Sequence, residues 1–316
     1  MEFISLLLPI LAIIVTGFLF ARFNLLPEGT GDRLIQFAMW VAIPALLFSV
    51  IAQEPFEKLL NPAFFICFGG SVLIVSCAVF AYVRLWLQKP LSETTLTAFM
   101  AVGSNTAFVA LPVLHAMFGH KAVLPTAIAT LILIILILIT SILLDRFQTE
   151  PTAKRPSIAL GFGRALLNPL VLSSVLGVAY AATGLPLPDM VKQYLGLLAM
   201  AVTPCALFAI GLSIRLGDLS NDAGVMVAIS VIKLVVFPAS VLGLAVLLHL
   251  DPILTIAATI CAAVPVGKTV FVLAQAHHDH PERVAATITM SSVASVLTLA
   301  AWLTLLAYLF PNTVPQ

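Results

Sequence analysis

Long apolar runs, separated by short stretches with charge, proline or glycine, dominate this 316-residue sequence. A helix needs about 20 apolar residues to cross roughly 30 Å of hydrocarbon. We interpret residues 3–20 as part of the first such helix rather than as a signal peptide, because no positive residue precedes them and no A-x-A-like site is present. The sequence predicts an all-α polytopic membrane protein with ten spans, near residues 3–21, 33–52, 62–87, 92–117, 122–144, 165–182, 190–213, 222–248, 253–276 and 283–309.

The composition agrees with a membrane location. Apolar residues make up 61% of the chain and charged residues 9%, and the mean hydropathy is +1.13, whereas about a quarter of the residues in a soluble domain are charged. The formal net charge of +1 includes no basic stripe, which argues against a nucleic-acid partner. The four cysteines lie in apolar runs, where we expect small hydrophobic side chains and no disulfide, metal or cofactor site.

The fourth and ninth runs are each interrupted by polar and helix-breaking residues. The first interruption lies between Ala101 and Pro112 and contains GSNT, and the second lies between Cys261 and Thr269 and contains VPVGK. A freed backbone amide or carbonyl is tolerated in a membrane only where protein buries it or where it lines a water-filled cavity. Paired broken helices mark the substrate sites of many secondary transporters, so the sequence predicts such a site near the bilayer midplane.

The two halves of the chain can be aligned without a gap at an offset of 160 residues. This offset pairs Pro9 with Pro169, Gly17 with Gly177, Pro44 with Pro204, Phe48 with Phe208, Asn61 with Asn221, His120 with His280, and Asn105 with Pro265. Each half has an odd number of spans, so the halves must lie in opposite orientations. We therefore predict two inverted five-helix repeats, residues 1–145 and 165–316, joined by a cytoplasmic linker over residues 146–164.

The distribution of Lys and Arg in the loops predicts the orientation, because cytoplasmic loops are enriched in both residues. One side carries ten of them: Arg22, Arg33, Arg84, Lys89, Arg146, Lys154, Arg155, Arg164, Arg215 and Arg283. The other side carries three: Lys58, Lys121 and Lys192. The first side is therefore predicted to be cytoplasmic, with both termini on the non-cytoplasmic side.

Lys268 and Lys233 lie deep inside predicted spans, where charged residues are costly and usually face a cavity. Lys268 follows Pro265 by three residues, and half-helix N-termini next to it would present unpaired N–H groups and positive dipole ends to an anion. The sequence therefore predicts a site for a small carboxylate. Its candidate substrate-binding residues are Ser104, Asn105, Thr106, Pro112, Pro265, Gly267, Lys268 and Thr269.

Several of these residues also have a structural interpretation. Lys268 could snorkel or satisfy the carbonyls left free at the break, and the Asn105 amide could cap the half-helix. Pro112 and Pro265 could shape the backbone without touching substrate. Lys233 adjoins no break in the sequence, so we favour a structural role for it, compensating carbonyls left free near Pro238.

Residues for ion coupling are harder to identify, since no Asp or Glu lies well inside a span. His115, one turn beyond Pro112, is a candidate proton relay, and packing is its alternative role. The segment 277–280, with three histidines and an aspartate, is interpreted as a hydrated turn rather than a metal site. Pro44 and Pro204 are expected to kink their helices and to border the site.

The chain resembles bacterial members of the auxin efflux carrier family over nearly its whole length. The resemblance rests on the order and spacing of Leu6–Pro9, Gly17–Leu26, Ile43–Phe48, Ser104–Asn105 with Leu111–Pro112, and Val264–Pro265 with Val270–Ala274. The chain departs from the plant pattern by its short central loop. It also has Ser104 and Ala110 where many relatives have glycine near the break of the fourth helix.

The resemblance implies the fold of bile acid sodium symporters. Helices 1, 2, 6 and 7 would form a scaffold domain, and helices 3–5 and 8–10 a transport domain that holds the crossing broken helices. It further implies an elevator motion, a homodimer in the bacterial inner membrane, and a substrate such as malonate, malate or a similar organic anion. Pro44 and Pro204 would then line the site from the scaffold side.

An intramembrane enzyme, and a passive channel or sensor, are the two alternatives to a carrier. An intramembrane enzyme would need an Asp pair, a Ser/His set, an H-E-x-x-H or an acidic diphosphate motif, and the predicted spans contain none of these. We therefore do not expect an enzyme. A passive channel or a non-transporting sensor built on the same repeat remains the alternative, because such proteins would share the spans and the breaks.

Overall fold

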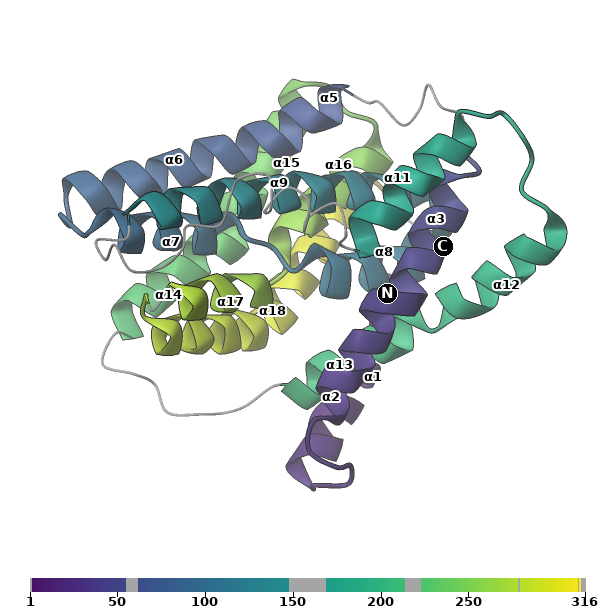
Figure 1. Cartoon of the computed structure of the whole chain (residues 1–316), viewed down its shortest axis with the longest axis horizontal. Helices are drawn as coiled ribbons and strands as arrows, with labels where there is room; N and C mark the ends of the chain where they lie inside the picture. Colours follow the sequence, from purple (N-terminus) through teal and green to yellow (C-terminus); the bar gives the residue numbers. More distant parts are fainter. Residues whose placement is uncertain are drawn as a thin grey trace.

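The computed structural model describes residues 2–54, 62–147, 169–213, 223–277, 279–311 and 313, and these residues form helices without a named strand (Figure 1). Helices of the first half are α1 (Glu2–Arg22), α2 (Thr30–Phe37), η1 (Ala38–Ala42), α3 (Ile43–Ile51), α5 (Pro62–Phe64), η2 (Phe65–Gly69), α6 (Gly70–Leu85), α7 (Leu91–Val102), η3 (Thr106–Ala110), α8 (Leu111–Phe118), η4 (Gly119–Ala122) and α9 (Val123–Phe147). Helices of the second half are α11 (Pro169–Ala181), α12 (Asp189–Met200), α13 (Val202–Ser213), α14 (Ala223–Val231), η5 (Ile232–Val236), α15 (Phe237–Leu247), α16 (Pro252–Ala263), α17 (Lys268–Ala276) and α18 (Pro281–Leu309).

The all-helical character predicted from the sequence is confirmed, and helices occupy the described parts of all ten predicted spans. Six helical stretches of the described chain are long and apolar enough to cross a membrane: Thr30–Ile51, Pro62–Leu85, Thr106–Leu144, Asp189–Leu212, Ala223–Leu247 and Pro281–Leu309. Three further apolar helices, Ala12–Arg22, Pro169–Ala181 and Pro252–Ala263, are shorter. The count of ten spans therefore stays a prediction. Most of the predicted linker 146–164 lies outside the described residues.

Prolines coincide with local irregularities in these helices. Proline lacks an N–H group and collides with the carbonyl four residues before it. Pro44, Pro112 and Pro238 each lie in the first turn of an α-helix that directly follows a π-helical segment. Pro204 follows an interruption of the helix at Ala201. The wider turns accommodate the missing hydrogen bonds at Pro44, Pro112 and Pro238. The kinks at Pro44 and Pro204 stay a prediction.

Two helix pairs approach closely at glycine. A Cβ atom added to Gly17 on α1 would lie 2.2 Å from the carbonyl oxygen of Phe208 on α13. In the opposite direction, a Cβ atom added to Gly211 on α13 would lie 2.1 Å from the carbonyl oxygen of Ile14 on α1. On α11, a Cβ atom added to Gly177 would lie 3.0 Å from Ile51 on α3. Absence of a side chain therefore lets α1 reach α13, and α11 reach α3, almost backbone to backbone.

We expect Gly211→Ala to destabilise the protein because its methyl group must push α1 away from α13. Overpacking of this kind costs about 1–3 kcal/mol. The matched control is Gly243→Ala on α15, where an added Cβ meets no atom within 4 Å. Thermal unfolding in detergent should show a lower midpoint for Gly211→Ala and an unchanged or higher one for Gly243→Ala. Equal unfolding midpoints for Gly211→Ala and Gly243→Ala would mean that α1 and α13 are not in close contact.

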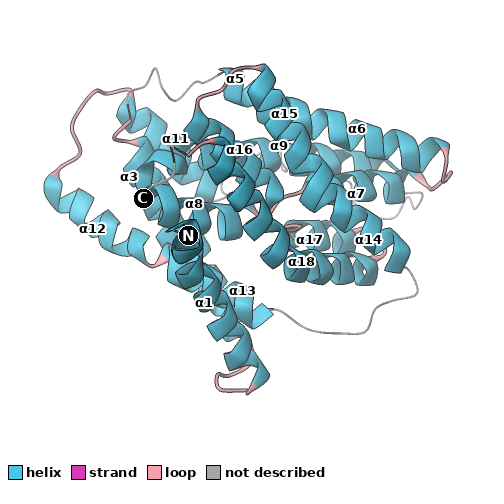
Figure 2. Ribbon diagram, turned by 180° about the vertical axis from the view of Figure 1, so that it is seen from behind, coloured by secondary structure: helices cyan, strands magenta, loops and turns pink. Residues whose placement is uncertain are grey.

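Helix α16 forms the centre of the largest core cluster. Residues 256–264 are almost fully excluded from solvent, and the helix packs against α15, α9 and α18. Figure 2 shows α16 between α8 and α15, whereas α12 lies at the edge of the molecule. A helix that is apolar around its whole circumference is buried on all sides. The interruption at the end of α16 is therefore placed inside the protein.

Candidate functional site

The two interrupted helices meet at a short antiparallel crossing. Ser104 and Val266 form an isolated β-bridge. The Asn105 N–H donates to the carbonyl oxygen of Pro265 at 2.9 Å, and the Gly267 N–H donates to that of Gly103 at 2.8 Å. Each extended segment thus satisfies backbone groups that the other leaves free, as a membrane interior demands. The crossing of the two predicted breaks is a finding of the structure.

The local sequence explains why both helices end here. Proline disfavours a helical conformation in the residue before it, and Val264, before Pro265, is extended with φ −72° and ψ 157°. In the other helix, Gly103 leaves the α-region with φ −69° and ψ 79°. A Cβ atom on Gly103 would lie 2.8 Å from the carbonyl oxygen of Phe99. Only glycine fits this turn without a shift of the backbone.

Four helix ends come together at the crossing. The C-terminal ends of α7 and α16 lead into it, and η3 and α17 start from it. The first N–H groups of a helix have no acceptor within that helix and form the positive end of its dipole. Such an end favours an anion. Asn105 is the N-cap residue of η3, yet its side chain makes no capping hydrogen bond, so the interpretation of its amide as a cap is wrong.

Lys268 is the first residue of α17, and its side chain is half exposed. Its Nζ lies 3.6 Å from Oδ1 of Asp32, the acidic residue in the first turn of α2. This ion pair joins the crossing to a helix that does not belong to it. Sequence reasoning missed Asp32 because the residue precedes the predicted span 33–52, and no local pattern relates it to Lys268.

The remaining predicted residues divide into buried and accessible groups. Thr106 is 3% exposed and accepts a hydrogen bond from the Thr130 hydroxyl at 2.9 Å, so packing onto α9 engages it. Pro112 is buried, and its carbonyl oxygen lies 3.4 Å from the Thr203 hydroxyl on α13. Pro265 and Gly267 are buried and supply backbone groups. The accessible or half-buried side chains at the crossing are those of Ser104, Asn105, Lys268 and Thr269.

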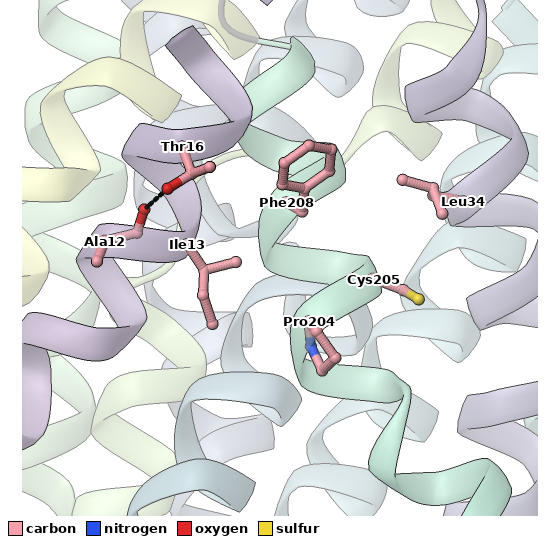
Figure 3. Close-up of a pocket in the computed structure, with 7 residues that line it drawn as sticks. All are labelled: Ala12, Ile13, Thr16, Leu34, Pro204, Cys205 and Phe208. Carbon is pink, nitrogen blue, oxygen red and sulfur yellow. Dashed lines mark hydrogen bonds between the residues drawn. The ribbon is translucent and has the colours of Figure 1, made fainter. Parts of the chain in front are cut away.

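Pro204 lines a different place, a pocket of about 500 Å³ between α1, α2 and α13 (Figure 3). The pocket shares no lining residue with the crossing. Its lining is mostly apolar, and the Thr16 hydroxyl already donates to the carbonyl oxygen of Ala12 at 2.7 Å. Among the described residues that line this pocket, none is positively charged, so these residues do not favour a carboxylate. Its lining residues are Ala12, Ile13, Thr16, Leu34, Pro204, Cys205 and Phe208.

His115 lies near the end of α8 with its ring centroid 5.7 Å from that of His120. Proximity of the two rings was not foreseen, since His120 belongs to the turn η4 rather than to the helix. The candidate relay is thus a pair of imidazoles, at the far end of α8 from the break. Pro44, in the first turn of α3, is half-buried.

Lys233 has a different hydrogen-bond partner from the one predicted from the sequence. Its ammonium donates to the carbonyl oxygen of Ala262 on α16. The carbonyl that Pro238 leaves free, that of Leu234, instead accepts the indole N–H of Trp302 at 2.8 Å. The expectation that Lys233 compensates carbonyls near Pro238 is therefore wrong, because Trp302 does so from α18.

Charged residues gather where α7 and α18 begin. Arg283 donates to Glu93 at 2.6 Å, and Lys89 and His280 lie 3.3 and 4.0 Å from the same carboxylate. The turn before α18 is not simply hydrated, because Asp279 is half-buried, and burial raises the pKa of its carboxyl. His278 lies outside the described residues. Among those described, no group of three metal-ligating side chains is present.

A chain of long apolar helices in which two broken helices cross at an inner site is, by its architecture, a multi-pass membrane protein of the transporter class. A family model described as "Membrane transport protein" matches residues 2–303. The chain therefore belongs to this family, the auxin efflux carrier family. The resemblance stated from the sequence is thereby confirmed.

Two relatives cover almost the same length. A protein of Rhizobium meliloti (strain 1021) named "Putative malonate transporter" is 28% identical over 307 residues, which is 96% of each chain. The "Uncharacterized transporter YfdV" of Escherichia coli (strain K12) is 22% identical over 307 residues, which is 95% of this chain and 96% of the relative. The similarity therefore includes both broken helices.

Proposed function

We propose that this protein is a secondary carrier for a small carboxylate such as malonate or malate. The observation that carries the proposal is the crossing, where η3 and α17 both begin. Asn105 precedes η3, Lys268 and Thr269 are the first two residues of α17, and Ser104 lies in the crossing itself, so polar side chains of these four residues lie at or next to both helix starts. A dicarboxylate offers acceptors for all of these donors. The name of the Rhizobium relative supports the same substrate class.

The proposed carrier has ten spans in two inverted repeats. Two equivalent contacts support this arrangement. Gly17 packs on Phe208, and Gly177 packs on Phe48. An offset of 160 residues relates the two glycines to each other and the two phenylalanines to each other. The scaffold domain would contain the pairs α1 with α13 and α3 with α11, and the transport domain would contain the crossing. We further propose an elevator motion of one domain past the other, in a homodimer in the inner membrane.

Counterflow in proteoliposomes of purified protein tests the proposed function. Radiolabelled malonate, malate, succinate and indole-3-acetate should be compared, each with and without a gradient of pH or sodium. Saturable counterflow of a dicarboxylate is expected, because a carrier exchanges substrate across the membrane. Flux that does not saturate would indicate a channel. Binding without flux would indicate a sensor.

Both termini are expected on the non-cytoplasmic side. Single cysteines replacing Arg22 and Lys121 in a cysteine-free background should then be labelled from opposite sides by a membrane-impermeant maleimide. Both positions are exposed in the structure, so access is not limited by packing. Labelling of both positions from the same side would rule out the predicted arrangement of spans.

We expect His115→Gln to flatten the pH dependence of counterflow if the two neighbouring imidazoles relay protons. Glutamine keeps hydrogen-bonding groups but does not titrate near neutral pH. His277→Gln is the control, since the His277 ring contacts its own helix at the Leu273 carbonyl oxygen. An unchanged pH profile in His115→Gln would assign His115 to packing alone.

A further inference from the structure

Lys233 is a charged residue for which the proposed substrate site has no use. It lies in the π-helical segment η5 and is 0% exposed. Its Nζ donates to the carbonyl oxygen of Ala262 and lies 5.1 Å from the centroid of the Phe237 ring. Within the described parts of the chain, no Asp or Glu forms an ion pair with it. A buried charge in a membrane protein usually has a functional reason.

The acceptor of this hydrogen bond belongs to the broken end of α16. Ala262 lies in the last turn of that helix, whose final four carbonyls have no N–H partner within the helix. These carbonyls form the negative end of the helix dipole. Three residues later, the carbonyl oxygen of Pro265 accepts the N–H of Asn105 in the crossing. Lys233 thus holds a positive charge against the half-helix end that leads directly into the candidate site.

A structural role within its own helix does not account for Lys233. The carbonyl that Pro238 leaves free is already bonded to Trp302, so Lys233 is not needed there. The π-helical turn carries it in the middle of a long helix, and such turns are frequent at functional sites. Burying an ammonium is costly unless it is hydrogen-bonded and offset by negative charge. The carbonyl end of α16 supplies that offset, together with the face of Phe237.

In ion-coupled carriers with broken helices, half-helix C-terminal ends and unwound carbonyls hold the coupling cation. We propose that the Lys233 ammonium takes the place of such a cation at the end of α16, so that the carrier works without Na⁺. This inference rests on the proposed function and adds a regulatory statement to it. The Lys233 ammonium would supply the positive charge at the end of α16, so the crossing would form without a bound Na⁺.

The test compares wild type, Lys233→Ala and Lys233→Met in proteoliposomes, with malonate as substrate. Wild-type counterflow should be equal in sodium and choline buffers. Both variants should lose at least about tenfold, and only Lys233→Ala, which leaves a cavity, should recover in part with Na⁺ or methylammonium. Lys192→Ala is the control, because Lys192 pairs with Asp189 at 3.8 Å on the surface. Sodium-dependent wild-type counterflow would overturn the proposal, as would wild-type rates in Lys233→Met.

A second measurement does not depend on transport. The midpoint of thermal unfolding in detergent should be the same in sodium and choline buffers for wild type, and should rise with Na⁺ or methylammonium for Lys233→Ala. If malonate is not carried at all, this measurement still tests the cation site while the proposed function fails. A sodium-specific rise in the wild-type midpoint contradicts the proposal even if neither variant folds. A folded Lys233→Ala that neither cation stabilises reduces Lys233 to a packing role.

Discussion

Lys268→Ala is expected to abolish most saturable uptake. A hydrogen bond to a charged group contributes about 1.5–3 kcal/mol, so its loss reduces kcat/KM by about 10- to 100-fold. The reason is geometric. Lys268 is the first residue of α17, so its side chain leaves the backbone beside the N–H groups that would bind the carboxylate. Initial rates of substrate uptake over a range of concentrations measure the effect. Lys268→Arg should retain part of the activity because the charge remains.

The ion pair with Asp32 offers a way to separate two roles of Lys268. If the lysine acts on the substrate, Asp32→Asn should retain uptake, since an exposed ion pair contributes about 1 kcal/mol or less. If Lys268 serves only to hold α2, Asp32→Asn should lose as much activity as Lys268→Ala. The control Lys121→Ala, in the turn η4, should resemble wild type. Wild-type uptake by Lys268→Ala would remove Lys268 from the site.

The second large effect is expected from Gly103→Ala. Its methyl group would lie 2.8 Å from the carbonyl oxygen of Phe99, and 3.1 and 3.2 Å from side-chain atoms of Phe99 and Val270. The main chain must move, and the bonds that pair Gly103 with Gly267 and Asn105 with Pro265 must change with it. Such strain costs about 1–3 kcal/mol. We expect both a lower thermal midpoint and uptake reduced at least about tenfold.

Gly267→Ala is the matched comparison on the facing segment. There the nearest atom to an added Cβ is the Ser104 carbonyl oxygen at 3.4 Å, an ordinary contact, and the backbone has φ −74° and ψ 144°, which any residue adopts. Its thermal midpoint should equal that of wild type. Any loss of uptake would then report on contact with the anion rather than on folding. Equal midpoints for the two alanine variants would contradict the geometry described for Gly103.

The positions of the helices could be predicted from the sequence because hydrophobic length is a strong local signal. Predicted spans 33–52 and 190–213 correspond to the stretches Thr30–Ile51 and Asp189–Leu212. Both breaks were also predictable, since Pro265 and Gly103 act on their own backbone. These features depend on residues close together in the chain.

Partners distant in sequence could not be predicted. The local pattern does not indicate that Asp32 forms an ion pair with Lys268. It also does not indicate that Trp302 donates to the carbonyl oxygen of Leu234, or Lys233 to that of Ala262. The sequence predicts a site role for Thr106 because it is polar and adjoins the break. Its burial against Thr130 depends on how α9 packs, which a single sequence does not reveal. Tertiary packing therefore decides which polar residues of a break remain available.

The bridge between Ser104 and Val266 is made by main-chain atoms alone. The Ser104 side chain is therefore not part of the bridge, so replacing Ser104 should leave both backbone hydrogen bonds in place while changing a side chain of the proposed site. Descendants of one ancestral carrier could exchange this residue and acquire a preference for a different acid in few mutational steps. Diversification of transported acids would then proceed at little risk to folding.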